Sequence, residues 1–148
     1  MKILFIMPSL DNGYWKKLGK KIGPRSEPLS LLYLATFLNQ HGHDAEVLDC
    51  NTEGVSMEEL EPRIQQGCYD VVGVAMLTAM YSQSVAVCRL VKSINPSIRV
   101  VVGGSHANLR PKQTADQVDA IDVVTVGEGE LTFLELLDVF AGKKMLND

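Results

Sequence analysis

The 148-residue chain is long enough for one domain with a sizeable core, and 46% hydrophobic with 22% charged residues is usual for a globular protein. The formal net charge of −4 gives no basic excess to neutralise phosphates, which argues against nucleic-acid binding. No apolar run approaches the ~20 residues that span a bilayer. We therefore expect a cytoplasmic protein with no membrane partner.

The N-terminal part of the chain predicts a strand and then, after a long connection, a helix. Residues 2–7 form an apolar run that predicts a strand and is too short for a signal peptide. A helix is expected over 29–40, with Pro28 suited to its first turn and Gly42 to its C-terminal stop. Its apolar residues recur at helical spacing: Leu31, Leu34, Ala35 and Leu38.

The middle of the chain predicts two strands with a helix between them. Residues 45–49 and 70–76 are the expected strands. Ser56 and Glu59 have the spacing of a capping box, which would open the helix. Pro62 lies inside this helix and should kink or shorten it, because proline lacks a backbone donor and clashes with the preceding turn.

The C-terminal part repeats the alternation. Residues 82–94 predict a helix, and 99–102 predict a strand buried on both faces because three valines follow one another. A weaker helix follows Pro111, and 122–126 predict a fifth strand. A last helix ends at Gly142 and has an apolar stripe that consists of Phe133, Leu136, Leu137 and Phe140.

Five strands alternating with helices require a parallel sheet covered on both faces. The expected fold is a flavodoxin-like, doubly wound α/β domain with strand order 2-1-3-4-5 and three αβα layers. The ligand edge of such a sheet collects the loops after strands one, three, four and five. We expect the domain to occupy residues 1–142, and residues 143–148 to begin a linker to a domain that this chain lacks.

Two neighbouring strands run into glycines at the edge where ligands bind in this fold. The fourth strand ends in Gly103 and Gly104, and the fifth runs into Gly127, Glu128 and Gly129. Glycine removes side-chain bulk where a strand leaves the sheet. Two adjacent bare strand ends predict a flat, bulky ligand lying against backbone.

The connection from Ser9 to Glu27 is far longer than the usual βα loop of about 2–6 residues. It contains Tyr14, Trp15 and five of the 14 basic residues. A loop of this length either covers a ligand or faces a partner, or it is an inert mobile segment.

Several polar residues at strand ends allow a structural and a functional interpretation. Thr78 could bond a ligand nitrogen or cap the next helix. His106 could ligate a metal, bond a polar group of a ligand, or hold its own loop. Glu128 and Glu130 could cap the last helix. Asp49 is interpreted as a loop-capping residue.

The remaining histidines and the cysteines are expected to be structural or solvated. His41 and His43 follow the first helix at the opposite edge of the sheet and should be solvated. Cys50, Cys68 and Cys88 are spaced too far apart for a local zinc or iron–sulfur site, so they are expected to be reduced thiols.

The motifs of common nucleotide-binding folds are absent. No GxGxxG follows the first strand, and no GxxxxGKS/T occurs in the chain. Ser9 alone is a weak match to a flavodoxin phosphate loop. Met76–Ala79 replaces the aspartate that a phosphoacceptor receiver domain needs after its third strand.

An ordered set of segments resembles the N-terminal cobalamin-binding domain of cobalamin-dependent radical S-adenosylmethionine enzymes, such as anaerobic magnesium-protoporphyrin IX monomethyl ester cyclases. The segments are Pro28–Ala35, His41–His43, Val47–Asp49, Tyr69–Gly73, Val101–Ala107 and Val126–Glu130. The resemblance covers the whole chain. It is specific for the domain and does not choose the reaction, which could be a cyclisation or a methylation.

The resemblance implies a corrinoid across the carboxyl edge of the sheet, with its nucleotide tail beside strands three and four. The residues that it places at the cofactor are Ser9, Leu10, Leu77, Thr78, Gly103, Gly104, Ser105, His106, Gly127, Glu128 and Gly129. It also implies S-adenosylmethionine and an iron–sulfur cluster in a downstream radical domain of the parent protein, not in this chain.

Two departures from related patterns limit what this chain can do. The methionine-synthase-like modules place a cobalt-ligating histidine after the first strand, but residues 9–27 contain none, so only His106 could substitute and no metal ligand is expected. The CxxxCxxC motif of the cluster is absent, so we expect no catalytic residue and no activity from this chain alone. The alternatives are a flavodoxin-like domain for another nucleotide and a non-catalytic docking domain.

Overall fold

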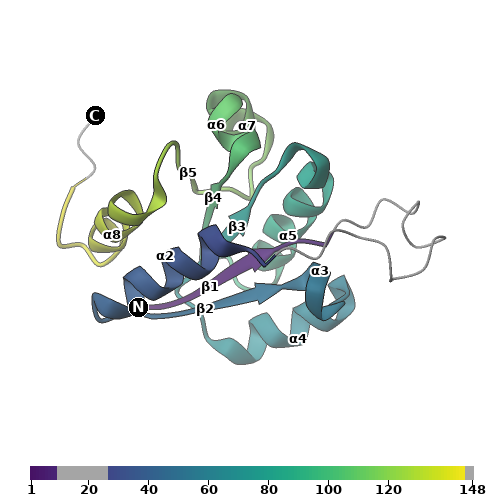
Figure 1. The fold of residues 1–148 in the computed structure, drawn as a ribbon, viewed down its shortest axis with the longest axis horizontal. Coiled ribbons are helices and arrows are strands. Elements are labelled where there is room, and N and C mark those ends of the chain that lie inside the picture. Colours follow the sequence, from purple (N-terminus) through teal and green to yellow (C-terminus); the bar gives the residue numbers. More distant parts are fainter. Residues whose placement is uncertain (10–26, 146–148) are drawn as a thin grey trace.

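The computed structural model describes residues 1–9 and 27–145, which contain a five-stranded parallel sheet of order β2-β1-β3-β4-β5 (Figure 1). This order confirms the predicted flavodoxin-like α/β fold. The strands are β1 (Lys2–Met7), β2 (Asp44–Asp49), β3 (Val71–Ala75), β4 (Arg99–Gly103) and β5 (Val123–Val124). Every pairing is parallel, so all five carboxyl ends meet at one edge of the sheet.

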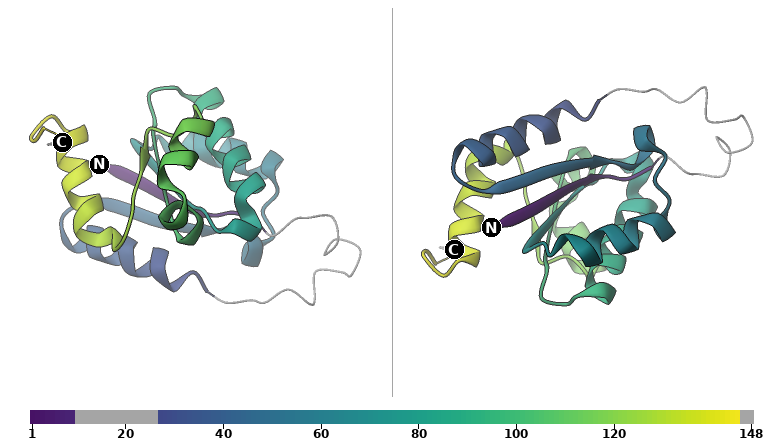
Figure 2. Two further views of the ribbon diagram at one scale, coloured as in Figure 1. Left: turned by 90° about the horizontal axis from the view of Figure 1, so that it is seen from above. Right: turned by 90° about the horizontal axis from the view of Figure 1, so that it is seen from below.

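Helices cover both faces of this sheet, as the views from above and below show (Figure 2). The helices are α2 (Leu29–Gln40), α3 (Cys50–Glu53), α4 (Met57–Gly67), η1 (Thr78–Met80), α5 (Tyr81–Ile94), α6 (Ser105–Leu109), α7 (Pro111–Gln117) and α8 (Gly129–Phe140). Side chains of α2 and α8 pack with Ile3 and Phe5 on one face. Side chains of α4 and α5 pack with Leu4 and Ile6 on the other.

Alternation along the strands produces these two cores. In β1, Ile3 and Phe5 face one helical layer while Leu4 and Ile6 face the other, and all four are at most 3% exposed. Because a strand presents successive side chains to opposite faces, a continuous apolar run is the pattern of a strand buried on both sides.

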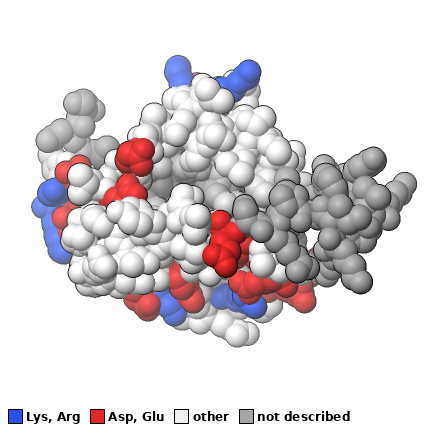
Figure 3. All heavy atoms as spheres, in the orientation of Figure 1, with Lys and Arg blue, Asp and Glu red and all other residues white. Residues whose placement is uncertain are grey.

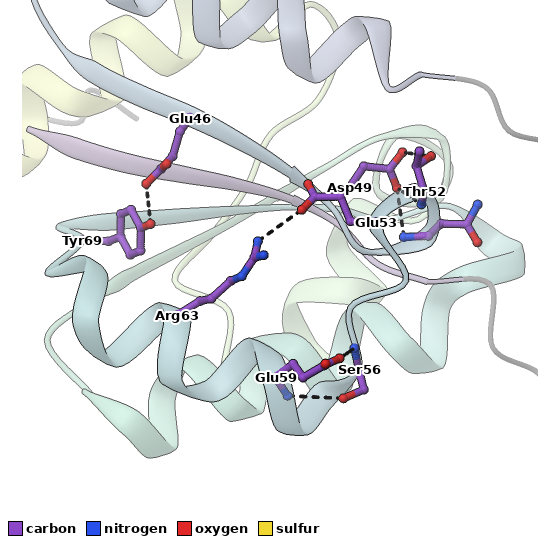
Figure 4. A network of polar contacts seen from close by, with 9 residues as sticks. Glu46, Asp49, Thr52, Glu53, Ser56, Glu59, Arg63 and Tyr69 are labelled. Carbon is purple, nitrogen blue, oxygen red and sulfur yellow. Dashed lines mark hydrogen bonds and ion pairs between the residues drawn. The ribbon is translucent and has the colours of Figure 1, made fainter.

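Local signals end and begin the helices much as the sequence predicts. Ser56 and Glu59 form the expected capping box of α4 (Figure 4). Asp49 accepts hydrogen bonds from the backbone N–H groups of Asn51 and Thr52, which confirms it as a capping residue. Gly142 follows α8 with a φ of +72°, a conformation that favours glycine at a helix end.

Other expectations are wrong in detail. Helix α4 continues through Pro62 to Gly67, so Pro62 does not shorten it. Pro62 is exposed while Leu60 and Ile64 on the same helix are buried, so packing of the apolar face offsets the lost hydrogen bond. Strand β5 is shorter than the expected 122–126, and η1, α3 and α6 were missed because such short helices have no readable periodicity.

Among the residues that the structure describes, none of the helices combines the length and the apolar character needed to cross a bilayer.

Candidate functional site

A pocket of about 210 Å³ opens at the carboxyl ends of β1, β3, β4 and β5, between the sheet and helices α2 and α8. Its lining is mostly apolar, with a few polar side chains, which is the usual character of a small-molecule site. We call it the edge pocket. It is lined by Phe5, Met7, Ser30, Leu31, Leu34, Gly73, Val74, Ala75, Leu77, Val101, Gly103, Gly104, Asn108, Thr125, Gly127, Glu128, Gly129, Glu130 and Phe133.

Strand β2 does not contribute to the edge pocket, because α3 closes its carboxyl end. Asp49 is the last residue of β2 and holds the first turn of α3 through its side chain, which also accepts a 2.6 Å hydrogen bond from the Thr52 hydroxyl (Figure 4). The open part of the edge is therefore limited to the four strands that the fold class predicts for a ligand.

Glycine in the sheet makes room for the floor of the pocket. A Cβ atom on Gly73 would lie 2.5 Å from Cδ1 of Phe5, whose ring packs edge-on against Phe133 at a centroid distance of 5.0 Å. A Cβ atom on Gly103 would lie 2.7 Å from Oγ1 of Thr125. Side chains at these two positions would collide with the pocket lining, so the cradle depends on bare backbone.

Gly104 is required by the backbone itself. Its φ of +115° and ψ of −177° lie in a region that is essentially restricted to glycine. A Cβ atom there would lie 3.0 Å from the carbonyl oxygen of Met76. The strand ends are pinned at this point, because Met76 N donates to Gly103 O at 2.7 Å and His106 N donates to Met76 O at 3.0 Å. Gly104 is therefore needed for the turn itself, and a role in ligand binding would come in addition.

The polar groups of the pocket are partly engaged. The Thr125 hydroxyl donates to Val102 O at 3.0 Å, and the Asn108 side-chain oxygen accepts from Gly127 N at 3.0 Å. The Asn108 side-chain nitrogen and the Ser30 hydroxyl have no hydrogen-bond partner among residues 1–9 and 27–145. These two groups are available to a ligand.

Glu128 and Glu130 line the pocket where α8 begins. Glu128 is the N-cap residue of α8, as one interpretation of the sequence expects, although its side chain makes no capping hydrogen bond. Glu130 lies in the first turn, where a carboxylate complements the helix dipole.

Six of the predicted cofactor residues line the edge pocket: Leu77, Gly103, Gly104, Gly127, Glu128 and Gly129. Ser9, Thr78, Ser105 and His106 do not line it. Leu10 lies outside the described residues, as does Trp15 in the long connection. Sequence reasoning missed Ser30, Leu31, Leu34 and Asn108, because no motif marks them and only the packing of α2 and α6 brings them to the strand ends.

Thr78 and His106 meet on the α5 side of the same edge. The Thr78 hydroxyl lies 3.2 Å from Nδ1 of His106, and the His106 ring packs on Tyr81 at a centroid distance of 4.6 Å. Neither η1 nor α5 has a side-chain N-cap, so the interpretation of Thr78 as a helix cap is wrong.

Large apolar side chains are exposed along this edge. Leu29, Leu109, Val126 and Leu131 are 52% to 78% exposed, and each lies where a helix or loop meets the strand ends. The neighbouring surface over α2 carries no Lys, Arg, Asp or Glu (Figure 3). Contiguous exposed apolar surface is typical of a binding surface.

A second hollow, of about 530 Å³, lies between α5 and the end of α7. It is lined by Tyr81, Ser82, Val85, Arg89, Gln117 and Val118, and it is open to solvent. It lies on the flank of the domain and has no glycine cradle, so the edge pocket is the better candidate.

Histidines and cysteines elsewhere have structural surroundings. His41 is exposed, but His43 is half-buried with an unpartnered Nδ1, so the expectation of a solvated His43 is wrong. All three cysteines are free. Burial raises the pKa of Cys50 to about 11 and that of Cys88 to about 12, which disfavours the thiolate form that metal clusters require.

A protein-family model described as the B12 binding domain matches residues 15–137. The chain is 32% identical over 141 residues to an uncharacterized methyltransferase, PH0819, of Pyrococcus horikoshii, covering 95% of this chain and 30% of the relative. It is 29% identical over 138 residues to the anaerobic magnesium-protoporphyrin IX monomethyl ester cyclase of Rubrivivax gelatinosus, covering 93% and 24%. The chain thus spans less than a third of the length of either relative.

Solved structures share the fold. The radical S-adenosylmethionine methyltransferase TsrM from Kitasatospora setae, with cobalamin and a 4Fe-4S cluster bound, superposes with a TM-score of 0.78 at 19% identity, over 98% of this chain and 28% of that chain. A CheY-like protein from Pseudomonas aeruginosa superposes with a TM-score of 0.61 at 15% identity, over the full length of both chains.

Proposed function

Since the chain belongs to the B12-binding domain family, we propose that it binds cobalamin with the nucleotide base in the edge pocket and the corrin ring over the strand ends. The observation that carries the proposal is the glycine-walled apolar pocket of about 210 Å³. A protein cavity of about 150 Å³ accommodates benzene. The edge pocket is therefore suited to a bicyclic aromatic group, whereas a whole cobalamin must extend beyond it.

Different residues of the pocket would make different contacts with such a ligand. Phe5 and Phe133 would pack against the flat base, with Gly73 leaving room between strand and ring. Ser30 and the Asn108 amide would supply hydrogen bonds. The exposed apolar side chains of the edge would be covered by the larger part of the ligand. Bound cobalamin supplies a cobalt centre for methyl transfer or redox chemistry, and the chain binds and orients it.

We further infer that this domain works with a radical S-adenosylmethionine domain in a longer polypeptide. The relatives that match nearly all of this chain are three to four times as long and include both a methyltransferase and a cyclase by name. The radical S-adenosylmethionine methyltransferase TsrM, in which the matching part is 28% of the chain, supports a partner domain of that kind. S-adenosylmethionine and the iron–sulfur cluster would belong to that partner domain.

Titration of the 148-residue chain with hydroxocobalamin under anaerobic conditions tests the proposal. We expect saturable binding, followed by the visible spectrum and by calorimetry. Ser30→Trp should weaken binding about fivefold to 150-fold, because a bulky group at the mouth of a packed site costs about 1–3 kcal/mol. Ser30 is exposed, so the fold should survive the change.

Thr36→Trp is the matched control, because Thr36 is exposed on the same helix and does not line the pocket. It should bind as the wild type does. Preferential binding of flavin mononucleotide would instead favour a flavodoxin-like nucleotide site. A folded chain that binds neither compound would contradict the proposal and favour a docking domain.

A further inference from the structure

Three side chains from the segments that follow β3 and β4 form a cluster beside the edge pocket. Thr78 and Tyr81 come from the connection after β3, and His106 comes from the first turn of α6 after β4. The Thr78 hydroxyl and His106 Nδ1 are 3.2 Å apart, and the His106 and Tyr81 rings are tilted by 41° at 4.6 Å. We call these residues the edge cluster.

The backbone on both sides of the edge cluster is held firmly. His106 N donates to Met76 O, and Asn108 N donates to Gly104 O at 2.9 Å. The buried Ser84 hydroxyl bonds to Ala75 O at 2.9 Å and to Met80 O at 3.0 Å, which ties the β3–α5 connection to α5. The His106 ring is therefore positioned before any ligand arrives, and a preorganised group binds at a lower entropic cost.

The other ring nitrogen of His106, Nε2, has no hydrogen-bond partner among the described residues. His106 is half-buried at the edge, two residues after Gly104, which lines the pocket. Thr78 directly follows Leu77, another pocket residue. The edge cluster thus adjoins the pocket lining on both segments, within reach of a ligand larger than the pocket of about 210 Å³.

We propose that His106 binds a side-chain amide on the rim of the corrin ring through Nε2, with Thr78 and Tyr81 as positioning residues. This inference rests on the proposed function. The Thr78 hydroxyl can donate to Nδ1 or accept from it, so Nε2 either donates or accepts. A primary amide suits both cases, because it has a carbonyl oxygen and an N–H₂ group.

Hydrogen bonding fits these surroundings better than ligation of cobalt. An imidazole that binds a metal commonly donates its second N–H to a carboxylate, a backbone carbonyl or water. Nδ1 of His106 has no carboxylate or backbone carbonyl partner among the described residues and meets only the Thr78 hydroxyl.

Hydroxocobalamin titrations of four variants of the 148-residue chain test this role. His106→Ala should raise the Kd about fivefold to tenfold, as expected for one hydrogen bond in a preorganised site. His106→Gln keeps an amide nitrogen near the position of Nε2 and should recover most of the affinity. Thr78→Val should have a smaller effect. Tyr81→Leu removes the ring contact that positions His106 and should also raise the Kd by less than His106→Ala does.

Two spectroscopic measurements separate a direct contact from a structural role and from ligation. With nitrogen-15-labelled histidine, the His106 Nε2 resonance should shift on binding, while those of His41 and His43, at the opposite edge, should stay in place. After chemical reduction of the bound hydroxocobalamin from Co(III) to Co(II), the electron paramagnetic resonance spectrum should be the same for the wild type and His106→Ala.

Three results would overturn the inference while the proposed function stands. They are a Kd for His106→Ala within about twofold of the wild type, an unmoved Nε2 resonance, and a nitrogen splitting of the Co(II) spectrum that changes with the histidine label. The last result would make His106 a cobalt ligand. A folded wild-type chain that binds no hydroxocobalamin would overturn the proposed function and this inference with it.

Discussion

The two edges of this sheet are formed by the same five strands, but their side chains differ in polarity and in pairing. At the amino edge, several polar groups are paired, although Nδ1 of His43 is not: Lys2 N donates to Asp70 at 2.7 Å, Tyr69 donates to Glu46, and Asp122 accepts from Val100 N at 2.7 Å (Figure 4 shows the Tyr69–Glu46 pair). At the carboxyl edge, glycines line a pocket, apolar side chains are exposed, and polar atoms of Ser30 and Asn108 lack partners among the described residues.

This difference favours the carboxyl edge as the binding edge. Exposed apolar side chains around a pocket add nothing to the stability of the domain by itself, and such a surface is typical of a binding site. The carboxyl edge keeps its donors and its apolar surface available. Each variant below changes a residue at one of the two edges, and its effect on stability or on cobalamin affinity tests this comparison.

The largest effect is expected from Gly104→Ala at the carboxyl edge. The substitution combines a glycine-only conformation with a contact to Met76 O at 3.0 Å, and should lower the free energy of unfolding by about 3 kcal/mol. Chemical denaturation measures it. Gly127→Ala is the control, because Gly127 has a φ of +85° but no atom within 4 Å of a Cβ, and should cost about 1 kcal/mol. Equal losses would show that the Met76 contact is unimportant.

Asp122→Ala at the amino edge should cost about 2 kcal/mol and leave cobalamin affinity unchanged. Its carboxylate accepts from Val100 N and pairs with Lys92 at 2.6 Å and Arg99 at 3.6 Å, so the substitution removes a charged acceptor for all three groups. Asp119→Ala, at an exposed residue nearby, should stay within about 0.5 kcal/mol. Weakened binding in Asp122→Ala would mean that the two edges are coupled.

The smallest effect is a pH dependence at the amino edge. Burial lowers the pKa of His43, with the N-terminus and Lys143 adding to the shift. The unfolded chain therefore takes up a proton more readily than the folded chain, and stability falls as the pH drops below about 6.5. His43→Gln should flatten the dependence of unfolding free energy on pH. Identical slopes for wild type and His43→Gln would contradict the assignment.

The strands and long helices of this protein could be predicted from the sequence because their signals are local. Consecutive valines, the helical spacing of Leu31, Leu34 and Leu38, and the Ser56–Glu59 capping box each act within a few residues. Parallel pairing and the strand order then follow from the alternation of strands with helices. The glycines at the ends of strands four and five also predicted which edge would be open.

Only the tertiary structure decided which residues line the edge pocket and which form the edge cluster. Ser30, Leu34 and Asn108 enter the edge pocket because helices α2 and α6 pack against the strand ends, and no local pattern encodes that approach. Thr78 and His106 are separated by 28 positions and meet only because β3 and β4 are neighbours. Sequence patterns register the preferences of single segments, whereas a binding site depends on distances between segments that the packing of the core sets.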